Sequence, residues 1–150
     1  GGGLGLVASC HFAVACESAV IGTPEIKRGL FPMMIMAVLQ RVVPRRKLVE
    51  MMLLGDKMSA AQGMELGLLN RVVADEGLDE AVAELTDKLV SRSPTAMRMG
   101  LEAFSAQADL PLEKALPHLN GQLMAILKTE DAREGLMAFM QKRDPVWTGR

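Results

Sequence analysis

The spacing of apolar residues changes near residue 75. This change predicts a first part with both helices and strands, followed by a part made of helices alone. In the second part, apolar side chains recur every three or four residues, as on one face of an α-helix. The clearest stripe is formed by Leu78, Val82, Leu85 and Leu89. Ser93 and Thr129 are suited to cap the starts of two later helices. Pro117 lies within a third stripe, where it must kink the helix or delay its start.

The sequence of the first part predicts short helices and short strands. These are a helix over residues 3–10, strands over 11–15, 19–21 and 71–74, and helices over 33–42 and 44–55. The first two strands lie on either side of a turn. Residues 33–42 are apolar nearly all round, so we expect that helix to be buried on most faces. Ser59 and Gln62 have the spacing of a capping box and predict one further short helix.

A carboxylate stands in an apolar setting in the run PEIKRGLFPM, where Glu25 is followed by residues that include Leu30 and Met33. Burial disfavours the charged form of a carboxylate, which suits a group that carries a proton. Three glycines open the chain ahead of an apolar helix, and they leave N–H groups free to hold an anion. Together these features indicate enolate chemistry. Taken singly, Glu25 is better explained as a helix-start cap, and the glycines as a turn or a linker.

Composition excludes several classes of function. At 150 residues, with 49% hydrophobic and 23% charged residues, the chain suits one globular domain with a core. A formal net charge of −1 argues against a nucleic-acid partner. Cys10 and Cys16 form no metal-site or disulfide pattern, which favours a reducing compartment. No apolar run could cross a bilayer. We therefore expect no membrane association and a cytoplasmic location, or the mitochondrial matrix if the source is eukaryotic.

Four segments resemble, in order, the crotonase family, also called the enoyl-CoA hydratase/isomerase family. They are GGGLGLVASCHFAVACESAVIGTPEIKRGLFP, LLGDKMSAAQGMELGLLNRVV, SRSPTAMRMGLEAF and TEDAREGLMAFMQKRDPVWTGR. Because family members are much longer, the chain is similar to their C-terminal half. The resemblance implies an α/β fold, with residues 1–74 as the C-terminal part of a ββα spiral core. Residues 75–150 would form an all-helical region for trimerisation and CoA capping. Without the leading strands, we expect the chain alone to fold poorly and to lack activity.

The resemblance implies a catalytic site with one backbone donor and one carboxylate in this chain. Gly2 matches the glycine whose N–H helps to hold the thioester oxygen of an enolate, and the second donor precedes it in family members. Such donors are worth about 3 kcal/mol of barrier. Glu25 matches a glutamate that transfers a proton. The other glutamate of the family's hydratases would stand at Gly5. A single carboxylate suits double-bond isomerisation better than the addition of water.

The resemblance also implies contacts with the CoA nucleotide and with other subunits. Phe139 and Lys142 match residues that contact the adenine and a phosphate of CoA, commonly CoA bound to an adjacent subunit. A lysine is a flexible point charge suited to phosphate, while Phe139 can also serve core packing. Family members form homotrimers or hexamers made of two trimers, and the apolar stripes fit such an interface. No metal or redox cofactor is implied, because CoA is part of the substrate.

Departures from the family pattern leave alternatives open. Gly5 replaces a catalytic carboxylate and His11 replaces the usual aspartate, as expected of a CoA-binding or assembly protein that has lost its chemistry. In PMMIMAVLQR, methionines replace a glycine-rich segment and should reshape the acyl pocket. Thioester hydrolysis and decarboxylation also stay open, because the family runs all these reactions on one oxyanion hole. RNA binding is a third alternative, which the charge balance disfavours.

Overall fold

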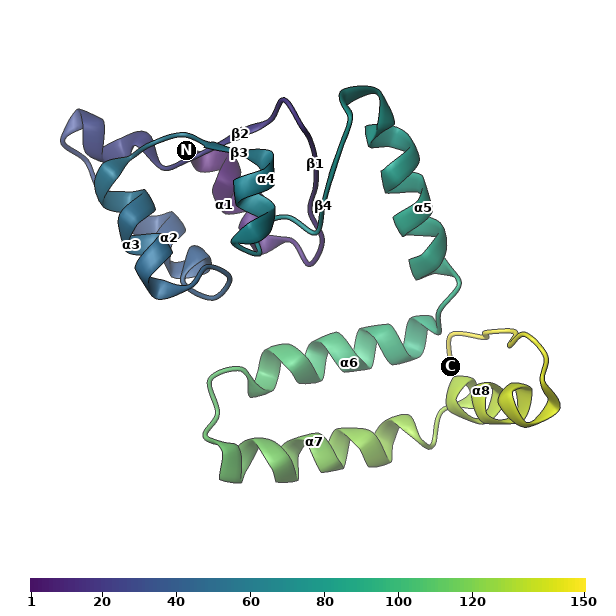
Figure 1. Ribbon diagram of the computed structural model, residues 1–150. Helices are drawn as coiled ribbons and strands as arrows, with labels where there is room; N and C mark the ends of the chain where they lie inside the picture. Colours follow the sequence, from purple (N-terminus) through teal and green to yellow (C-terminus); the bar gives the residue numbers. More distant parts are fainter. The chain divides into compact units, whose positions relative to one another are not determined.

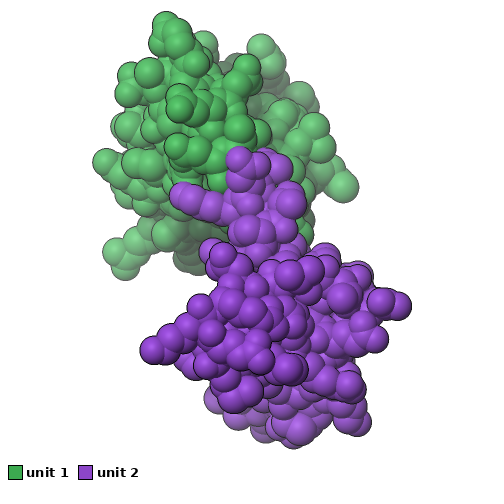
Figure 2. Space-filling model, turned by 90° about the vertical axis from the view of Figure 1, so that its right-hand side faces the viewer, with its two compact units in different colours: residues 1–84 green, residues 85–150 purple.

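The structure, a computed structural model, describes all 150 residues and divides into two compact units (Figure 2). Unit 1 is Gly1–Glu84 and unit 2 is Leu85–Arg150. The last strand of the chain ends at Val73, and only helices and their connections follow. The change from mixed to helical structure thus falls where the spacing of apolar residues changes. The roles assigned to residues 1–74 and 75–150 stay predictions.

Four short strands form two separate pairs in unit 1 (Figure 1). β1 (Val14–Cys16) runs parallel to β4 (Arg71–Val73), and β2 (Val20–Ile21) is antiparallel to β3 (Met58–Ser59). The two strands predicted around a turn are present, but each pairs with a distant strand and not with the other. β3 was not predicted from the sequence, because a strand of two residues is too short to show an alternating apolar pattern.

Five helices precede β4 in unit 1. They are α1 (Gly2–Ser9), the 3₁₀ helix η1 (Pro24–Arg28), α2 (Met33–Leu39), α3 (Arg45–Leu54) and α4 (Ala60–Glu65). α1 packs against α2, and η1 packs against α3. The capping box of α4 is confirmed, since Ser59 Oγ accepts from the N–H of Gln62 at 3.2 Å and Gln62 Oε1 accepts from the N–H of Ser59 at 2.9 Å. One core joins the elements, and it includes Leu4, Ile21, Leu39, Leu48, Met51 and Leu69.

α2 is less buried than its sequence predicts. Leu39 is fully covered, whereas Met33 and Met34 are 61% and 86% exposed. The helix also ends at Leu39 and does not continue to residue 42. The expectation of burial on most faces is wrong for this chain, because α1 packs on one side of α2 and leaves the first turn uncovered.

The rest of the chain is helical. After the short 3₁₀ helix η2 (Asp75–Gly77) come α5 (Leu78–Val90), α6 (Pro94–Gln107), α7 (Leu112–Ile126) and α8 (Glu130–Gln141). α6 and α7 run side by side in opposite directions (Figure 1). The predicted caps are confirmed, since the hydroxyls of Ser93 and Thr129 each accept from an N–H three residues on. Pro117 lies inside α7 and does not delay its start. None of the helices combines the length and the apolar character needed to cross a membrane.

A buried carboxylate in unit 2 joins the starts of two helices to the C-terminal residues. Asp131, only 2% exposed, accepts a hydrogen bond from the hydroxyl of Ser93 at 2.6 Å. It also accepts from the N–H groups of Thr148 and Gly149 at 2.8 and 3.1 Å. These donors, the Ser93 hydroxyl above all, lower the pKa of Asp131 to about 2. The end of the chain is therefore folded back onto α8 and the start of α6.

Alanine at Gly55 and at Gly29 tests how the chain turns after α3 and η1. Both glycines have positive φ, where a residue with a side chain costs about 1–2 kcal/mol. A Cβ at Gly55 would also lie 2.7 Å from Cγ2 of Ile26, whereas one at Gly29 would meet nothing within 4 Å. We expect both variants to lose free energy of unfolding in urea, Gly55→Ala more than Gly29→Ala. Equal losses would contradict the close packing of Gly55 on η1.

Acid should destabilise unit 2 through two carboxylates. Hydrogen bonds from Arg143 lower the pKa of Glu134 to about 2, as Ser93 does for Asp131. A carboxylate with a depressed folded pKa contributes stability above its unfolded pKa, and that stability is lost as the pH falls from about 4 toward 2. We expect the Tm to drop over this range, less steeply in Asp131→Asn and Glu134→Gln. An unchanged slope in both variants would refute this assignment.

Candidate active site

The N-terminus of α1 presents free backbone donors. Gly2 is the first residue of the helix, and the N–H of Leu4 donates to the carbonyl of Gly1 at 2.9 Å. The N–H groups of Gly2 and Gly3 precede this first intrahelical bond and so have no partner in the helix. Cβ atoms added at Gly2 or Gly3 would meet nothing within 4 Å. An anionic oxygen can therefore reach these amides and the positive end of the helix dipole.

The start of α1 is tied to the segment that enters η1. The Gly1 nitrogen donates to the carbonyl of Gly22 at 2.6 Å. Gly22 has no room for a side chain, because a Cβ there would lie 2.9 Å from the carbonyl oxygen of Asp56. The next residue, Thr23, is fully buried, and its hydroxyl donates to the carbonyl of Met51 on α3 at 3.0 Å. These contacts fix the entry to η1 against both α1 and α3.

Glu25, on η1, has a carboxylate oxygen that is buried and unpaired. The residue is half-buried, and its Oε2 has no hydrogen-bond partner. The apolar surroundings expected from the sequence are only partly present, because Leu30 and Met33 are exposed. Thr95 Oγ1 and His118 Nε2 are the other buried unpaired side-chain atoms, and both lie in unit 2. Because buried polar atoms are normally hydrogen-bonded, the free oxygen of Glu25 requires an explanation, and a catalytic role is one.

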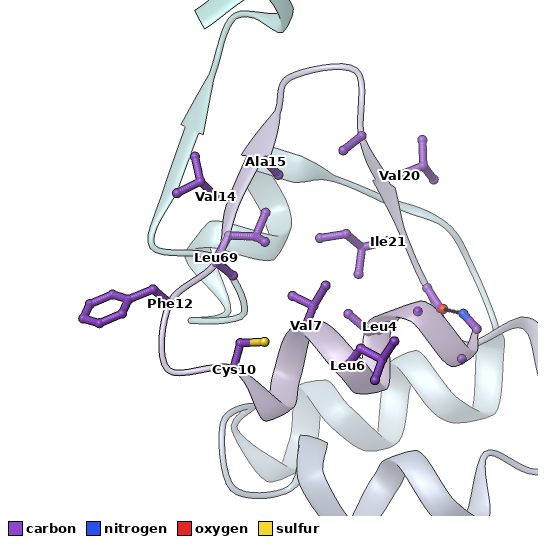
Figure 3. Close-up of a pocket in the computed structure, with 16 residues that line it drawn as sticks. Leu4, Leu6, Val7, Cys10, Phe12, Val14, Ala15, Val20, Ile21 and Leu69 are labelled. Atoms are coloured by element: carbon purple, nitrogen blue, oxygen red, sulfur yellow. Dashed lines mark hydrogen bonds between the residues drawn. The ribbon is translucent and has the colours of Figure 1, made fainter. Parts of the chain in front are cut away.

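An apolar cavity of about 710 Å³ opens beside the three glycines (Figure 3). Its walls come from α1, β1 and β2, and in Figure 3 Ile21 of β2 lies above Val7 of α1. Its apolar lining also includes Leu4, Leu6, Phe12, Val14, Val20 and Leu69. Glu25 is not among the residues that line it. The volume and lining are those of a site for an apolar ligand, with the amides of α1 at its edge.

Gly5 faces α2. A Cβ at Gly5 would lie 3.5 Å from Cβ of Ile35, and the outer carbons of that side chain would lie 3.8 and 3.9 Å away. An alanine fits at this distance, but a longer side chain would have to displace Ile35. The position where a second carboxylate is expected is therefore bordered by an apolar side chain.

Phe139 and Lys142 lie at the end of α8, in a different unit from Gly2 and Glu25. Phe139 is 82% exposed, which rules out core packing within this chain. Lys142 is also exposed, and its ammonium group forms no ion pair within the chain. Both side chains are available to a ligand or to another subunit.

Three residues that position the site, Gly22, Thr23 and Ile35, are not among those predicted from the sequence. A glycine directly after a strand and before Thr23 could have indicated the close backbone approach at Gly22. Nothing in the sequence marks Thr23 or Ile35, because their partners, Met51 and Gly5, belong to other elements. The structure holds no group of three or more His, Cys, Asp or Glu side chains that could bind a metal ion, and both cysteines are free thiols.

Known proteins are similar to this chain in sequence and in structure. The model of the family described as enoyl-CoA hydratase/isomerase matches residues 1–150, and the chain belongs to this family. It is 35% identical over 155 residues to a protein named carnitinyl-CoA dehydratase from Salmonella heidelberg (strain SL476), covering 100% of this chain. The crystal structure of enoyl-CoA hydratase from Mycobacterium smegmatis matches with a TM-score of 0.94 and 34% identity over 97% of this chain. Human enoyl Coenzyme A hydratase domain-containing protein 3 matches with a TM-score of 0.92 and 35% identity, also over 97%.

The chain spans little more than half the length of these relatives. It covers 59% of the Salmonella protein and 57% of each of the two solved chains. The family and the fold class predicted from the sequence are confirmed: an α/β part of the crotonase fold is followed by helices. The roles of Gly2, Glu25, Phe139 and Lys142 stay predictions.

Gly5→Ala should stabilise unit 1. Gly5 lies inside α1, and alanine in a helix interior is more stable than glycine by about 0.5–1 kcal/mol. The added methyl group meets Ile35 at an ordinary contact distance. We expect a gain of that size in the free energy of unfolding, measured in urea. Gly22→Ala is the matched control and should be destabilised by its contact with the carbonyl of Asp56. A loss of stability in Gly5→Ala would show that α1 and α2 pack too tightly to admit a methyl group.

Proposed function

We propose that this chain is part of an enzyme that acts on an acyl-CoA thioester, in which the N–H of Gly2 stabilises an enolate oxygen and Glu25 transfers the proton. The buried, unpaired Oε2 of Glu25, on a segment tied to the start of α1, carries the proposal. The free amides of Gly2 and Gly3 supply an oxyanion donor. The apolar cavity beside them has room for an acyl chain.

A lone carboxylate suits a reaction that moves one proton between two carbons. As a carboxylate, Glu25 removes a proton from C2 of a 3-enoyl thioester, and the electron pair moves into the thioester carbonyl. The N–H of Gly2 donates to the resulting dienolate oxygen. Glu25, now a carboxylic acid, returns the proton to C4, which leaves the double bond between C2 and C3. No water is consumed, and Glu25 ends in its starting ionisation state.

Addition or removal of water is the next reaction to consider, because relatives are named as a dehydratase and a hydratase. Hydration of a 2-enoyl thioester places water oxygen on C3 and a proton on C2, and two carboxylates share these tasks readily. Gly5 supplies no carboxylate, and Ile35 borders its position. We therefore favour isomerisation over hydration, with thioester hydrolysis and decarboxylation as further reactions of the same oxyanion site.

Binding of the CoA nucleotide and assembly belong to the helical region in this proposal. Phe139 would contact the adenine and Lys142 a phosphate, and the helices would pack in a homotrimer or in a hexamer of two trimers. Exposed apolar side chains on these helices support an interface, since permanent interfaces are rich in apolar surface. They include Phe104, Leu112, Leu116, Leu123, Leu136 and Met140. No metal or redox cofactor takes part.

A CoA-binding protein without turnover is the second candidate. Gly5 brings no carboxylate to the site, and His11, which stands where the resemblance predicts an aspartate, is exposed. The two candidates agree on binding and differ in turnover. A kinetic measurement therefore separates them.

Glu25→Gln should remove most of the turnover and keep the fold. General acid–base groups contribute about 100- to 10,000-fold to the rate, and glutamine has the shape of glutamate without its proton chemistry. The protein, assembled as the proposed trimer or hexamer, is given 2-enoyl-CoA and 3-enoyl-CoA in heavy water. The product and its deuterium content are followed by mass spectrometry. We expect double-bond migration in the wild type and a fall in kcat of that size in the variant.

Glu17→Gln is the matched control, because Glu17 is an exposed glutamate of the same unit and should leave kcat unchanged. Unchanged turnover of every acyl-CoA by Glu25→Gln would show that the assigned role is wrong. Water addition to the 2-enoyl substrate would establish a hydratase that manages without a carboxylate at Gly5. Binding of CoA without any turnover by the wild type would establish the second candidate.

A further inference from the structure

Lys142 is the only residue besides glycine with a positive φ, at 53°. It ends α8, whereas the chain uses glycine at the other left-handed helix ends, Gly29 after η1, Gly55 after α3 and Gly67 after α4. The left-handed conformation is unfavourable for a residue with a Cβ, which is why glycine is usual there. A lysine at such a position points to a use for its side chain.

Backbone hydrogen bonds fix this conformation. The N–H of Lys142 donates to the carbonyl of Phe139 at 3.2 Å, and the N–H of Arg143 donates to the carbonyl of Ala138 at 3.1 Å. This is the pattern of a Schellman motif with Lys142 in the position usually held by glycine. The motif sets the direction in which the Lys142 side chain leaves the helix.

An ion pair holds the residue that follows Lys142. Arg143 donates to both carboxylate oxygens of Glu134, at 2.6 and 2.9 Å. Glu134 Oε1 also accepts from the N–H of Val146 at 2.8 Å. The segment that follows α8 is therefore bound to the Glu134 side chain at two residues, Arg143 and Val146. Glu134 lies on α8 itself, about two turns before Lys142. A bidentate pair of this kind has a defined geometry that ordinary surface ion pairs lack.

We propose that Glu134 and Arg143 are positioning residues that hold Lys142 in its left-handed conformation so that its ammonium group meets a phosphate of a bound nucleotide. The Lys142 side chain is free in this chain, and the exposed ring of Phe139 lies about one turn before it. An aromatic face near a fixed positive charge suits a planar base that carries phosphates. The inference rests on the proposed CoA site, and it assigns a role to two residues that need not touch the ligand.

A double-substitution cycle distinguishes positioning from general stabilisation. Binding of CoA to the assembled protein is measured by titration calorimetry for the wild type, Glu134→Gln, Lys142→Ala and the combined variant. We expect Lys142→Ala to weaken binding about fivefold, as for an exposed charge pair. Glu134→Gln should weaken binding by no more than that, and should have no further effect once Lys142 is alanine. Equal weakening by Glu134→Gln in both backgrounds would overturn the inference.

Further variants keep the test decisive if Glu134→Gln loses structure. Arg143→Lys keeps the charge but loses the bidentate geometry, and should weaken CoA binding only while Lys142 is present. Lys142→Gly relieves the backbone, so it should raise the Tm and weaken CoA binding as Lys142→Ala does. Glu102→Gln removes an exposed ion pair with Arg98 of 3.8 Å and is the matched control, with an unchanged Kd expected.

Failure of the CoA site and failure of this inference give different results. If Lys142→Ala and Lys142→Gly both bind CoA like the wild type, Lys142 does not contact the nucleotide and the site itself is wrong. If both bind weakly while Glu134→Gln and Arg143→Lys bind normally, the contact is correct and the positioning role is wrong. A Lys142→Gly variant with a lowered Tm would show that the left-handed backbone carries no strain to relieve.

Discussion

The close approach of three backbone segments at Gly22 is the constraint on which the candidate active site depends. The carbonyl of Gly22 receives the Gly1 nitrogen, and its Cα faces the carbonyl of Asp56 with room for hydrogen only. The start of α1, the entry to η1 and the loop after α3 therefore meet at one point. Contacts between backbones cannot relax by a change of rotamer. The amides of α1 and the side chain of Glu25 thus share a rigid support, and oxyanion donors contribute most when they are oriented in advance.

The starts of three helices could be predicted from the sequence because their causes are local. Ser59, Ser93 and Thr129 cap their helices as expected, since a hydroxyl-to-amide bond involves residues within one turn. Strand pairing, in contrast, depends on residues that lie far apart in the sequence. β1 and β2 follow one another along the chain but pair with β4 and β3, and strands of two or three residues carry too little pattern to specify a partner. The burial of α2 was beyond prediction for the same reason, since an apolar sequence does not say which element covers it.

The candidate site divides in the same way. Gly2 and Glu25 lie in short motifs, so their positions at a helix start and on a turn after a proline follow from the residues around them. The contact of Gly5 with Ile35 joins two helices and leaves no mark in the sequence of either. At Lys142 the usual sequence sign is missing altogether. A glycine usually indicates a left-handed helix end, and here that position is held by a lysine. The turn at Lys142 is held in part by Glu134, which lies about two helical turns earlier in the chain.

Three carboxylates of this chain differ in how fully the fold satisfies their oxygens. Both oxygens of Asp131 and of Glu134 accept hydrogen bonds, and the pKa of each is lowered to about 2. Protonation would break those bonds, so these groups stay ionised near neutral pH and hold the helical unit together. Glu25 has a buried oxygen that no group in the chain satisfies. Leaving a buried polar atom unpaired costs stability. Of the three, Glu25 alone has an oxygen that can take up a proton without breaking a bond of the fold.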